Sequence, residues 1–191
     1  MKKRIVVALT GASGLKLGDY FLRKVAENSE FFEKVFVIVS DNAKLVADAE
    51  NFSFDFSYFP ENFVLLNQND FSAPVASGSY PFEGMVVIPC SMSSLASMAS
   101  GVGTNLIHRV ADVCLKEGRK LIVVPRETPF SLVHIENMRK LALSGGRIVP
   151  FIPSFYNNPS GIEDMLDFFC IRIFDLLGVE IKDERRWRID E

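Results

Sequence analysis

Short apolar runs rich in Val and Ile alternate along the chain with longer segments whose apolar residues recur every three or four positions. The short runs predict buried strands, and the longer segments predict amphipathic helices. The expected strands are 4–9, 34–39, 84–88, 121–124 and 147–149, and the expected helices are 15–26, 43–50, 91–100, 104–117, 134–143 and 161–177. Alternating strands and helices predict a three-layer α/β fold with a mostly parallel central sheet and helices on both faces.

Segments with polar residues follow three of the expected strands, at 10–14, 89–94 and 125–129, and the first of them contains two glycines. In an open parallel sheet such loops gather along the carboxyl edge, where ligands bind. Glycines at a strand-to-helix turn let backbone N–H groups approach an anion, and the serine hydroxyls of 91–94 exceed the need of one helix cap. The loops therefore predict a site for a phosphorylated ligand. The alternative is a tight turn and a helix start, each capped by one serine.

Two charged residues stand at positions where a sequence usually places apolar ones. Arg172 falls near the middle of the apolar face of the last helix, where a buried guanidinium needs an anion, unless its end reaches solvent at the edge of the core. Tyr156 precedes that helix and could share a phosphate with Arg172. Glu50 ends an expected helix, and its side chain either faces the interior or is a surface carboxylate.

Other charged groups have simpler alternative explanations. Arg126 and Glu127 lie between two prolines, which present them stiffly, although they could also form a loop ion pair of little energetic weight. Lys116 ends an expected helix, where a cation is favoured in any case.

Two stretches depart from the strand–helix alternation. Residues 52–59 place Phe or Tyr at alternate positions, which predicts a half-buried strand or an aromatic patch that closes a site or meets another subunit. The charged tail 182–191 holds the single tryptophan, Trp187, which we expect to dock on the protein.

Composition limits the class of protein. A chain of 191 residues that is 48% hydrophobic predicts a single domain, 1–191, that ends in the charged tail. A net charge of −3 without a basic block argues against nucleic acid, and no apolar run is long enough to span a membrane, so we expect a cytoplasmic protein. Three scattered cysteines and two histidines predict neither disulfides nor a metal site. We expect His108 and His134 on helix surfaces.

Taken together, the motifs resemble the UbiX family of flavin prenyltransferases, which are flavodoxin-like, homo-oligomeric proteins. The resemblance extends from about Arg4 to Trp187. It is carried by 10–14 (TGASG), 73–78 (APVASG), 89–91 (PCS), 105–112 (NLIHRVAD), 115–117 (LKE), 124–130 (VPRETPF), 134–138 (HIENM) and 155–156 (FY).

This resemblance implies a reaction. Members of the family join the five-carbon unit of dimethylallyl phosphate to N5 and C6 of reduced FMN, without a metal. The prenylated FMN serves a UbiD-type decarboxylase. FMN would then be a substrate, and the assembly would be a homo-oligomer, often a dodecamer.

The resemblance also implies roles for individual residues. The expected FMN contacts are Gly11, Ala12, Ser13, Ser40, Ser91, Met92, Ser93, Ser94 and Arg126. The expected dimethylallyl phosphate contacts are Lys116, Arg126, Tyr156 and Arg172, of which Lys116 and Arg126 are candidates for supply across a subunit contact. Residues linked to the chemical steps are Ser13, Glu50, Glu127 and Trp187, with Glu127 the candidate for protonating the phosphate and Ser13 for relaying a proton.

Two other functions remain open from the sequence. A flavin-dependent decarboxylase of the same superfamily uses a histidine in the first helical region, and no histidine precedes His108. A non-catalytic FMN carrier needs the flavin loops but has no use for Lys116, Tyr156, Arg172 and Trp187 together.

Overall fold

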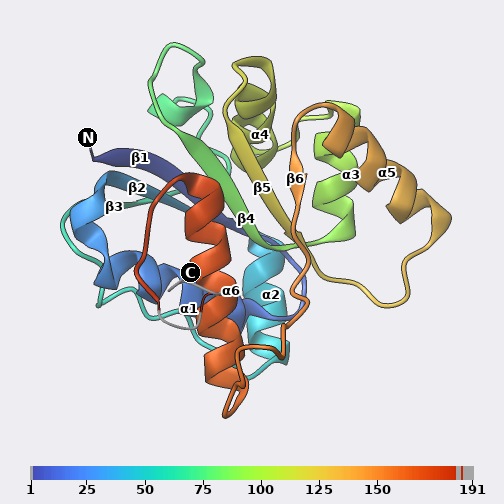
Figure 1. Ribbon diagram of the computed structural model, residues 1–191. Coiled ribbons are helices and arrows are strands. Elements are labelled where there is room, and N and C mark those ends of the chain that lie inside the picture. Colours follow the sequence, from blue (N-terminus) through green and yellow to red (C-terminus); the bar gives the residue numbers. More distant parts are fainter. Residues whose placement is uncertain (1, 184–185, 187–191) are drawn as a thin grey trace.

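The computed structural model describes residues 2–183 and residue 186. Six strands form one sheet in the order β3-β2-β1-β4-β5-β6, and every neighbouring pair is parallel (Figure 1). The strands are β1 (Lys3–Leu9), β2 (Phe32–Val39), β3 (Phe63–Leu66), β4 (Gly84–Cys90), β5 (Lys120–Pro125) and β6 (Arg147–Ile148). The predicted α/β class is confirmed.

Helices cover both faces of the sheet. They are α1 (Leu15–Glu27), α2 (Asp41–Ala49), α3 (Met92–Ser100), α4 (Leu106–Lys116), α5 (Leu132–Leu143) and α6 (Ile162–Leu177). Alternate residues of a strand point to opposite faces. Ile5 and Val7 of β1 accordingly pack with α1, α2 and α6, whereas Val6 and Ala8 pack with α3 and α4.

One buried hydroxyl joins the carboxyl ends of β1 and β4. Thr10 is 1% exposed, and its hydroxyl donates to the Pro89 carbonyl at 3.0 Å and accepts from the Ser91 N–H at 2.8 Å. The loop after β1 is thereby held against the loop after β4. Backbone hydrogen bonds continue this alignment to the neighbouring strands, from Ser40 N–H to Leu9 O at 3.0 Å and from Arg126 N–H to Cys90 O at 3.1 Å.

Residues 52–59 do not form the half-buried strand that the alternation predicts. The Asp55 carboxylate accepts from the Ser57 N–H, and the Phe59 N–H donates to Phe56 O, so the segment turns instead of extending. Its aromatic residues still pack on the core beside α1 and β2. The edge strand β3 was not predicted, because its four residues form a short apolar run without a distinct period.

The prediction of a surface His108 is wrong. The side chain is 7% exposed, and its Nδ1 accepts from the Thr104 N–H at 3.4 Å. His108 faces inward because it lies on the buried side of the first turn of α4. His134 is half-buried and takes part in the N-terminal cap of α5.

The three cysteine thiols are all free and buried. Among the described residues, the helices are too short or too polar to cross a membrane.

The Thr10 hydroxyl gives a test of how the sheet edge is held. We expect Thr10→Val to lower the free energy of unfolding by about 1–3 kcal/mol, because the buried Ser91 N–H loses its acceptor. Thr10→Ser keeps the hydroxyl and serves as the matched control. Urea denaturation measures the difference, and a Thr10→Val protein less destabilised than Thr10→Ser would contradict the assignment.

Candidate functional site

A cavity of about 520 Å³ opens at the carboxyl edge of the sheet. The loops that follow β1, β5 and β6 contribute to its walls, together with the ends of β4 and β5 and the starts of α1 and α6. Most of the lining is apolar, and the polar lining residues are Ser13, Lys16, Arg126, Glu127 and Thr128. Such a volume is ordinary for a site that encloses a small ligand, with a few polar groups to orient it.

Two glycines shape the loop after β1. A Cβ atom at Gly11 would lie 2.6 Å from the Cβ of Asn42, so only glycine lets this loop approach the start of α2 so closely. Gly14 has a φ of +96°, a left-handed conformation that glycine adopts at little cost. Gly14 is also the N-cap of α1 and brings no side chain to cap it.

Glu50 supplies the missing cap from the far end of α2. Its carboxylate accepts from the N–H groups of Gly14 at 2.7 Å and Leu15 at 3.3 Å, and also from the Ser13 hydroxyl. The half-buried carboxylate is thus neither in the interior nor free on the surface. Since it occupies the start of α1, the protein's own anion fills the position where the glycine loop would otherwise hold a phosphate.

The ionisation of Glu50 follows from these contacts. Burial acts to raise its pKa, but the hydrogen bonds from Ser13, Gly14 and Leu15 and the charge of Arg126 outweigh burial. The net effect lowers the pKa below its ordinary value, so Glu50 is a carboxylate at neutral pH.

The start of α3 remains open to an anion. Ser91 is its N-cap and accepts from the Ser94 N–H at 3.2 Å, and the two hydroxyls are 3.1 Å apart. Ser93 is exposed, and the first N–H groups of the helix, at Met92 and Ser93, have no partner within the helix. Ser40 is buried and caps α2 by accepting from the Ala43 N–H.

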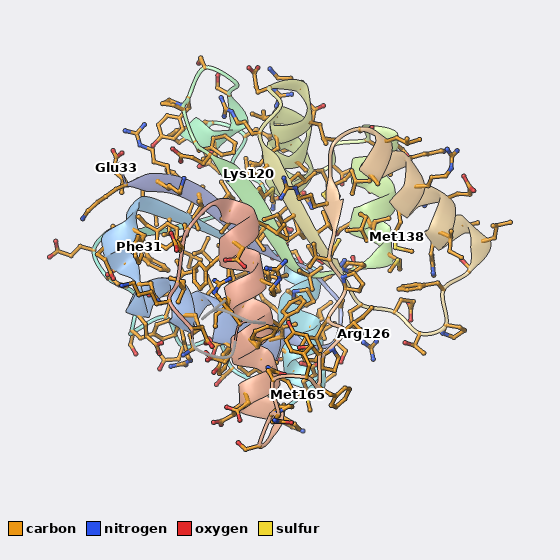
Figure 2. The ribbon with its side chains drawn as sticks, in the orientation of Figure 1. Phe31, Glu33, Lys120, Arg126, Met138 and Met165 are labelled. Atoms are coloured by element: carbon orange, nitrogen blue, oxygen red, sulfur yellow. The ribbon has the colours of Figure 1, made fainter. Side chains whose placement is uncertain are left out.

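Arg126 and Glu127 follow β5 and line the same cavity as Ser13. Arg126 is exposed, whereas Glu127 is half-buried and accepts from the Thr128 N–H at 3.0 Å. Arg126 lies on the carboxyl side of the sheet, opposite the end at which Lys120 begins β5 (Figure 2).

Tyr156 and Arg172 meet at a smaller cavity of about 180 Å³ beside the first one. Ile152 lines both cavities, so the predicted phosphate grip adjoins the site of Ser13 and Arg126. Of the two alternatives for Arg172, burial is wrong, and an end that reaches solvent is confirmed. Its side chain is 55% exposed and forms an ion pair with Asp175 at 2.6 Å, because it projects beside the inward face of α6.

Lys116 lies at the opposite edge of the sheet. It is the last residue of α4, pairs with Glu117 and adjoins Gly78, ahead of the start of β4. Within one chain the structure does not bring Lys116 together with Tyr156 and Arg172. Trp187 lies outside the described residues.

Several residues of the cavity wall were not predicted from the sequence. These are Lys16, Leu17, Val124, Phe130, Pro150, Phe151, Ile152, Ile162 and Leu166. Some of them follow strands β5 and β6, which was the available signal, but the apolar ones are indistinguishable in sequence from core residues. No group of three candidate metal ligands occurs among the described residues.

Comparison with known proteins places the chain in a family. The Flavoprotein family model matches residues 1–168. A flavin prenyltransferase UbiX from Methanocaldococcus jannaschii is 40% identical over 185 residues, covering 96% of this chain and 98% of that protein. The chain belongs to the UbiX family of flavin prenyltransferases. The flavin prenyltransferase LpdB from Lactiplantibacillus plantarum is also 40% identical, over 98% of this chain and 100% of that protein.

Solved structures of UbiX proteins share the fold. AnUbiX in complex with FMN and dimethylallyl pyrophosphate is 36% identical, with a TM-score of 0.86 over 98% of this chain and 100% of that one. A dodecameric FMN-dependent UbiX-like decarboxylase from Escherichia coli O157:H7 is also 36% identical, with a TM-score of 0.87 over 97% and 99%.

The Glu50 cap predicts a pH-dependent stability. We expect Glu50→Gln to lower the free energy of unfolding by about 1–2 kcal/mol at pH 7, because the amide accepts more weakly than the carboxylate. The lowered pKa stabilises the fold above the ordinary glutamate pKa, and this contribution is lost as the pH falls through the folded value.

The difference between wild type and Glu50→Gln should therefore shrink as the pH falls below about 4. Thermal denaturation from pH 3 to 7 measures it, and Glu30→Gln, at an exposed position, is the control. A difference that stays constant over this range would contradict a role for the ionised carboxylate.

Proposed function

We propose that this protein transfers the dimethylallyl group of dimethylallyl phosphate to N5 and C6 of reduced FMN, yielding prenylated FMN and phosphate. The observation that carries the proposal is one composite site. The apolar cavity with Ser13, Arg126 and Glu127 adjoins the cavity with Tyr156 and Arg172. A related chain, AnUbiX, contains FMN and dimethylallyl pyrophosphate.

The residues present fit FMN. Apolar walls formed by residues such as Pro89, Val124 and Phe151 suit a flat ring system, and the open N-terminus of α3 suits a phosphate. Ser93 adds a solvent-accessible hydroxyl at that helix start. Bound reduced FMN supplies the nucleophilic nitrogen and carbon to which the five-carbon group becomes attached.

The side chains contribute binding and proton transfer. Tyr156 and Arg172 hold the phosphate of the donor, and with Arg126 they stabilise the negative charge that grows as the C–O bond breaks. Glu127 gives a proton to the departing phosphate, and Ser13, bound to Glu50, relays a proton near the ring. The apolar walls keep water away from the positive charge on the allylic group.

A second copy of the chain completes this site. Lys116 cannot reach Tyr156 from its own edge of the sheet, so it serves the phosphate of a neighbouring copy. Helix α5 lies at the outside of the molecule (Figure 1) and offers an apolar contact area for assembly, because Leu132 is 73%, Val133 67% and Leu143 75% exposed. We propose a homo-oligomer, a dodecamer as in the Escherichia coli relative. Its product would serve a UbiD-type decarboxylase.

A decarboxylase is the second candidate, because that same relative is described as an FMN-dependent decarboxylase. Anaerobic incubation with reduced FMN and dimethylallyl phosphate, followed by mass spectrometry of the released flavin, separates the two candidates. The prenyltransferase gives a flavin heavier by one prenyl unit. Unmodified FMN from folded, flavin-loaded protein would contradict the proposal, and release of carbon dioxide from an aromatic acid would then favour the decarboxylase.

We expect Glu127→Gln to bind FMN normally but to form product about 100-fold more slowly.

Mixed assemblies test whether Lys116 acts across a subunit contact. Lys116→Ala and Arg172→Ala should each be inactive alone. When both are co-expressed in equal amounts, about a quarter of the sites combine an intact Lys116 with an intact Arg172 from different copies. Turnover should therefore recover to about a quarter of the wild-type value.

The control pair is Tyr156→Ala with Arg172→Ala. Both residues line one cavity of a single copy, so mixing cannot restore a site and activity should remain low. If mixtures of Lys116→Ala and Arg172→Ala show no more activity than this control pair, Lys116 does not serve a neighbouring site.

A further inference from the structure

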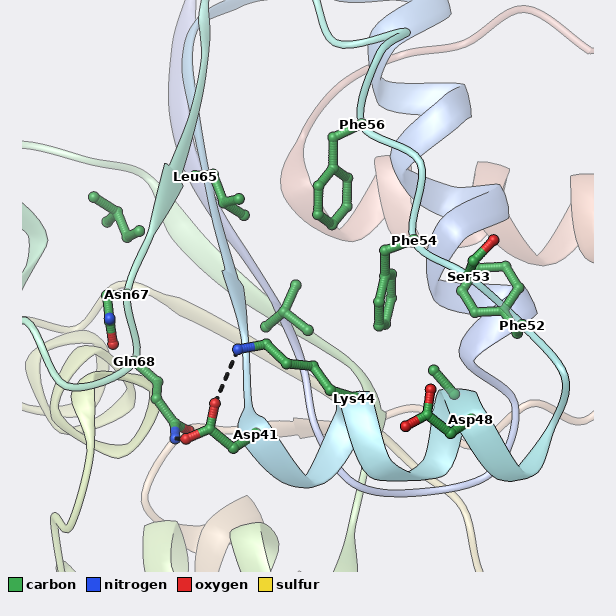
Figure 3. A pocket seen from close by; sticks show the side chains of 13 residues that line it. Asp41, Lys44, Asp48, Phe52, Ser53, Phe54, Phe56, Leu65, Asn67 and Gln68 are labelled. Atoms are coloured by element: carbon green, nitrogen blue, oxygen red, sulfur yellow. Dashed lines mark hydrogen bonds and ion pairs between the residues drawn. The ribbon is translucent and has the colours of Figure 1, made fainter.

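A second large cavity, of about 570 Å³, lies between α2, residues 52–56 and the end of β3 (Figure 3). It shares no lining residue with the cavity that holds Ser13 and Arg126. Its volume is in the usual range for small-molecule sites. The proposed transferase reaction makes no use of it.

Aromatic rings form one wall of this cavity. Phe54 and Phe56 stack with centroids 5.7 Å apart, and Phe52 meets Phe54 edge-on at 5.2 Å. The three rings are half-buried, so each keeps part of its surface for a ligand. Leu65 stands across the cavity from them and is 53% exposed (Figure 3). Apolar surface on both sides suits a ligand with a flat or bulky apolar body.

Charged residues of α2 form the adjoining wall. Lys44 donates to the Asp41 carboxylate at 2.9 Å, and the Gln68 side-chain amide donates to the other carboxylate oxygen at 2.5 Å. The hydrogen bond from Lys44 lowers the pKa of Asp41, which keeps this pair ionised and mutually neutralised. Asp48, one turn along the helix from Lys44, adds a negative charge that this pair does not balance.

We propose that this cavity binds a small organic cation with an aromatic or similarly sized apolar body. Asp48 and Phe54 border the same space (Figure 3), so a positive group can pair with the carboxylate while it lies against the negative face of a ring. The apolar body of the ligand covers the remaining surface of the rings and Leu65. A carboxylate or phosphate is disfavoured, because Asp48 repels it and Lys44 is already engaged by Asp41.

A matched series of probes tests the charge requirement. Phenethylamine, phenethyl alcohol and phenylpropionate share an aromatic ring but present a cation, a neutral group and an anion. Titration calorimetry on full-length protein saturated with FMN should give a dissociation constant of about 1 mM or tighter for phenethylamine. We expect binding at least about fivefold weaker for the alcohol, and weaker still for the anion.

Substitutions in the cavity wall test whether the probes bind in this cavity. Asp48→Asn should weaken phenethylamine about fivefold and leave phenethyl alcohol unchanged, since only the ion pair is lost. Phe54→Leu should weaken both probes, whereas Glu61→Gln, an exposed acid outside the cavity, should change neither. Thermal denaturation of each variant confirms that it is folded.

Any of four results would overturn the proposal. The first is that the wild-type protein does not bind phenethylamine, and the second is that FMN abolishes the binding, which would place the probe in the flavin cavity. The third is equal affinity for the amine and the alcohol, and the fourth is an unchanged amine affinity in Asp48→Asn. None of these results depends on whether the protein transfers a prenyl group. Failure of the cation site would therefore leave the proposed transferase activity untouched, and the reverse also holds.

Discussion

The candidate site depends on the hydroxyl of Thr10, which holds the ends of β1 and β4 together inside the protein. A parallel sheet aligns its strands but leaves the loops at its carboxyl edge free to diverge. The Thr10 hydroxyl prevents this, because it is buried and satisfies a carbonyl at the end of β4 and an N–H just after it. The backbone bonds of Ser40 and Arg126 extend the same alignment to β2 and β5. The cavity walls are therefore set by the strand register.

The helix N-termini at this edge differ in how well they can bind an anion. Glu50 neutralises the start of α1, and Ser40 caps α2 with a buried hydroxyl. The start of α3 alone combines a serine cap with an additional exposed hydroxyl at Ser93. An anion approaching these three helices consequently meets its most favourable partner at α3. In the proposed reaction, the Ser13–Glu50 pair would take part in proton transfer instead of phosphate binding.

Much of this architecture could be predicted from the sequence. Periodicity located the central strands and all six helices, because buried parallel strands and amphipathic helices leave strong signals. The family resemblance is confirmed by relatives that cover nearly the whole chain. The turn within residues 52–59 escaped prediction, because Asp55 breaks the strand through a local bond that alternation does not reveal. The sequence left Arg172 open between burial and exposure, because its angle around α6 differs only slightly from that of its buried neighbours. The cap by Glu50 joins residues 36 positions apart, a distance over which a helical pattern carries no information.

We propose that FMN and the donor phosphate occupy one site built from the carboxyl edge of one copy and Lys116 of another. A crystal structure of the assembled protein with FMN and dimethylallyl phosphate would show whether they do. We expect the flavin ring in the cavity beside Arg126, its phosphate at the start of α3, and the donor phosphate between Arg172 and the Lys116 of a neighbouring copy. A flavin bound away from this edge, or a complete donor site within a single copy, would contradict a site shared between copies.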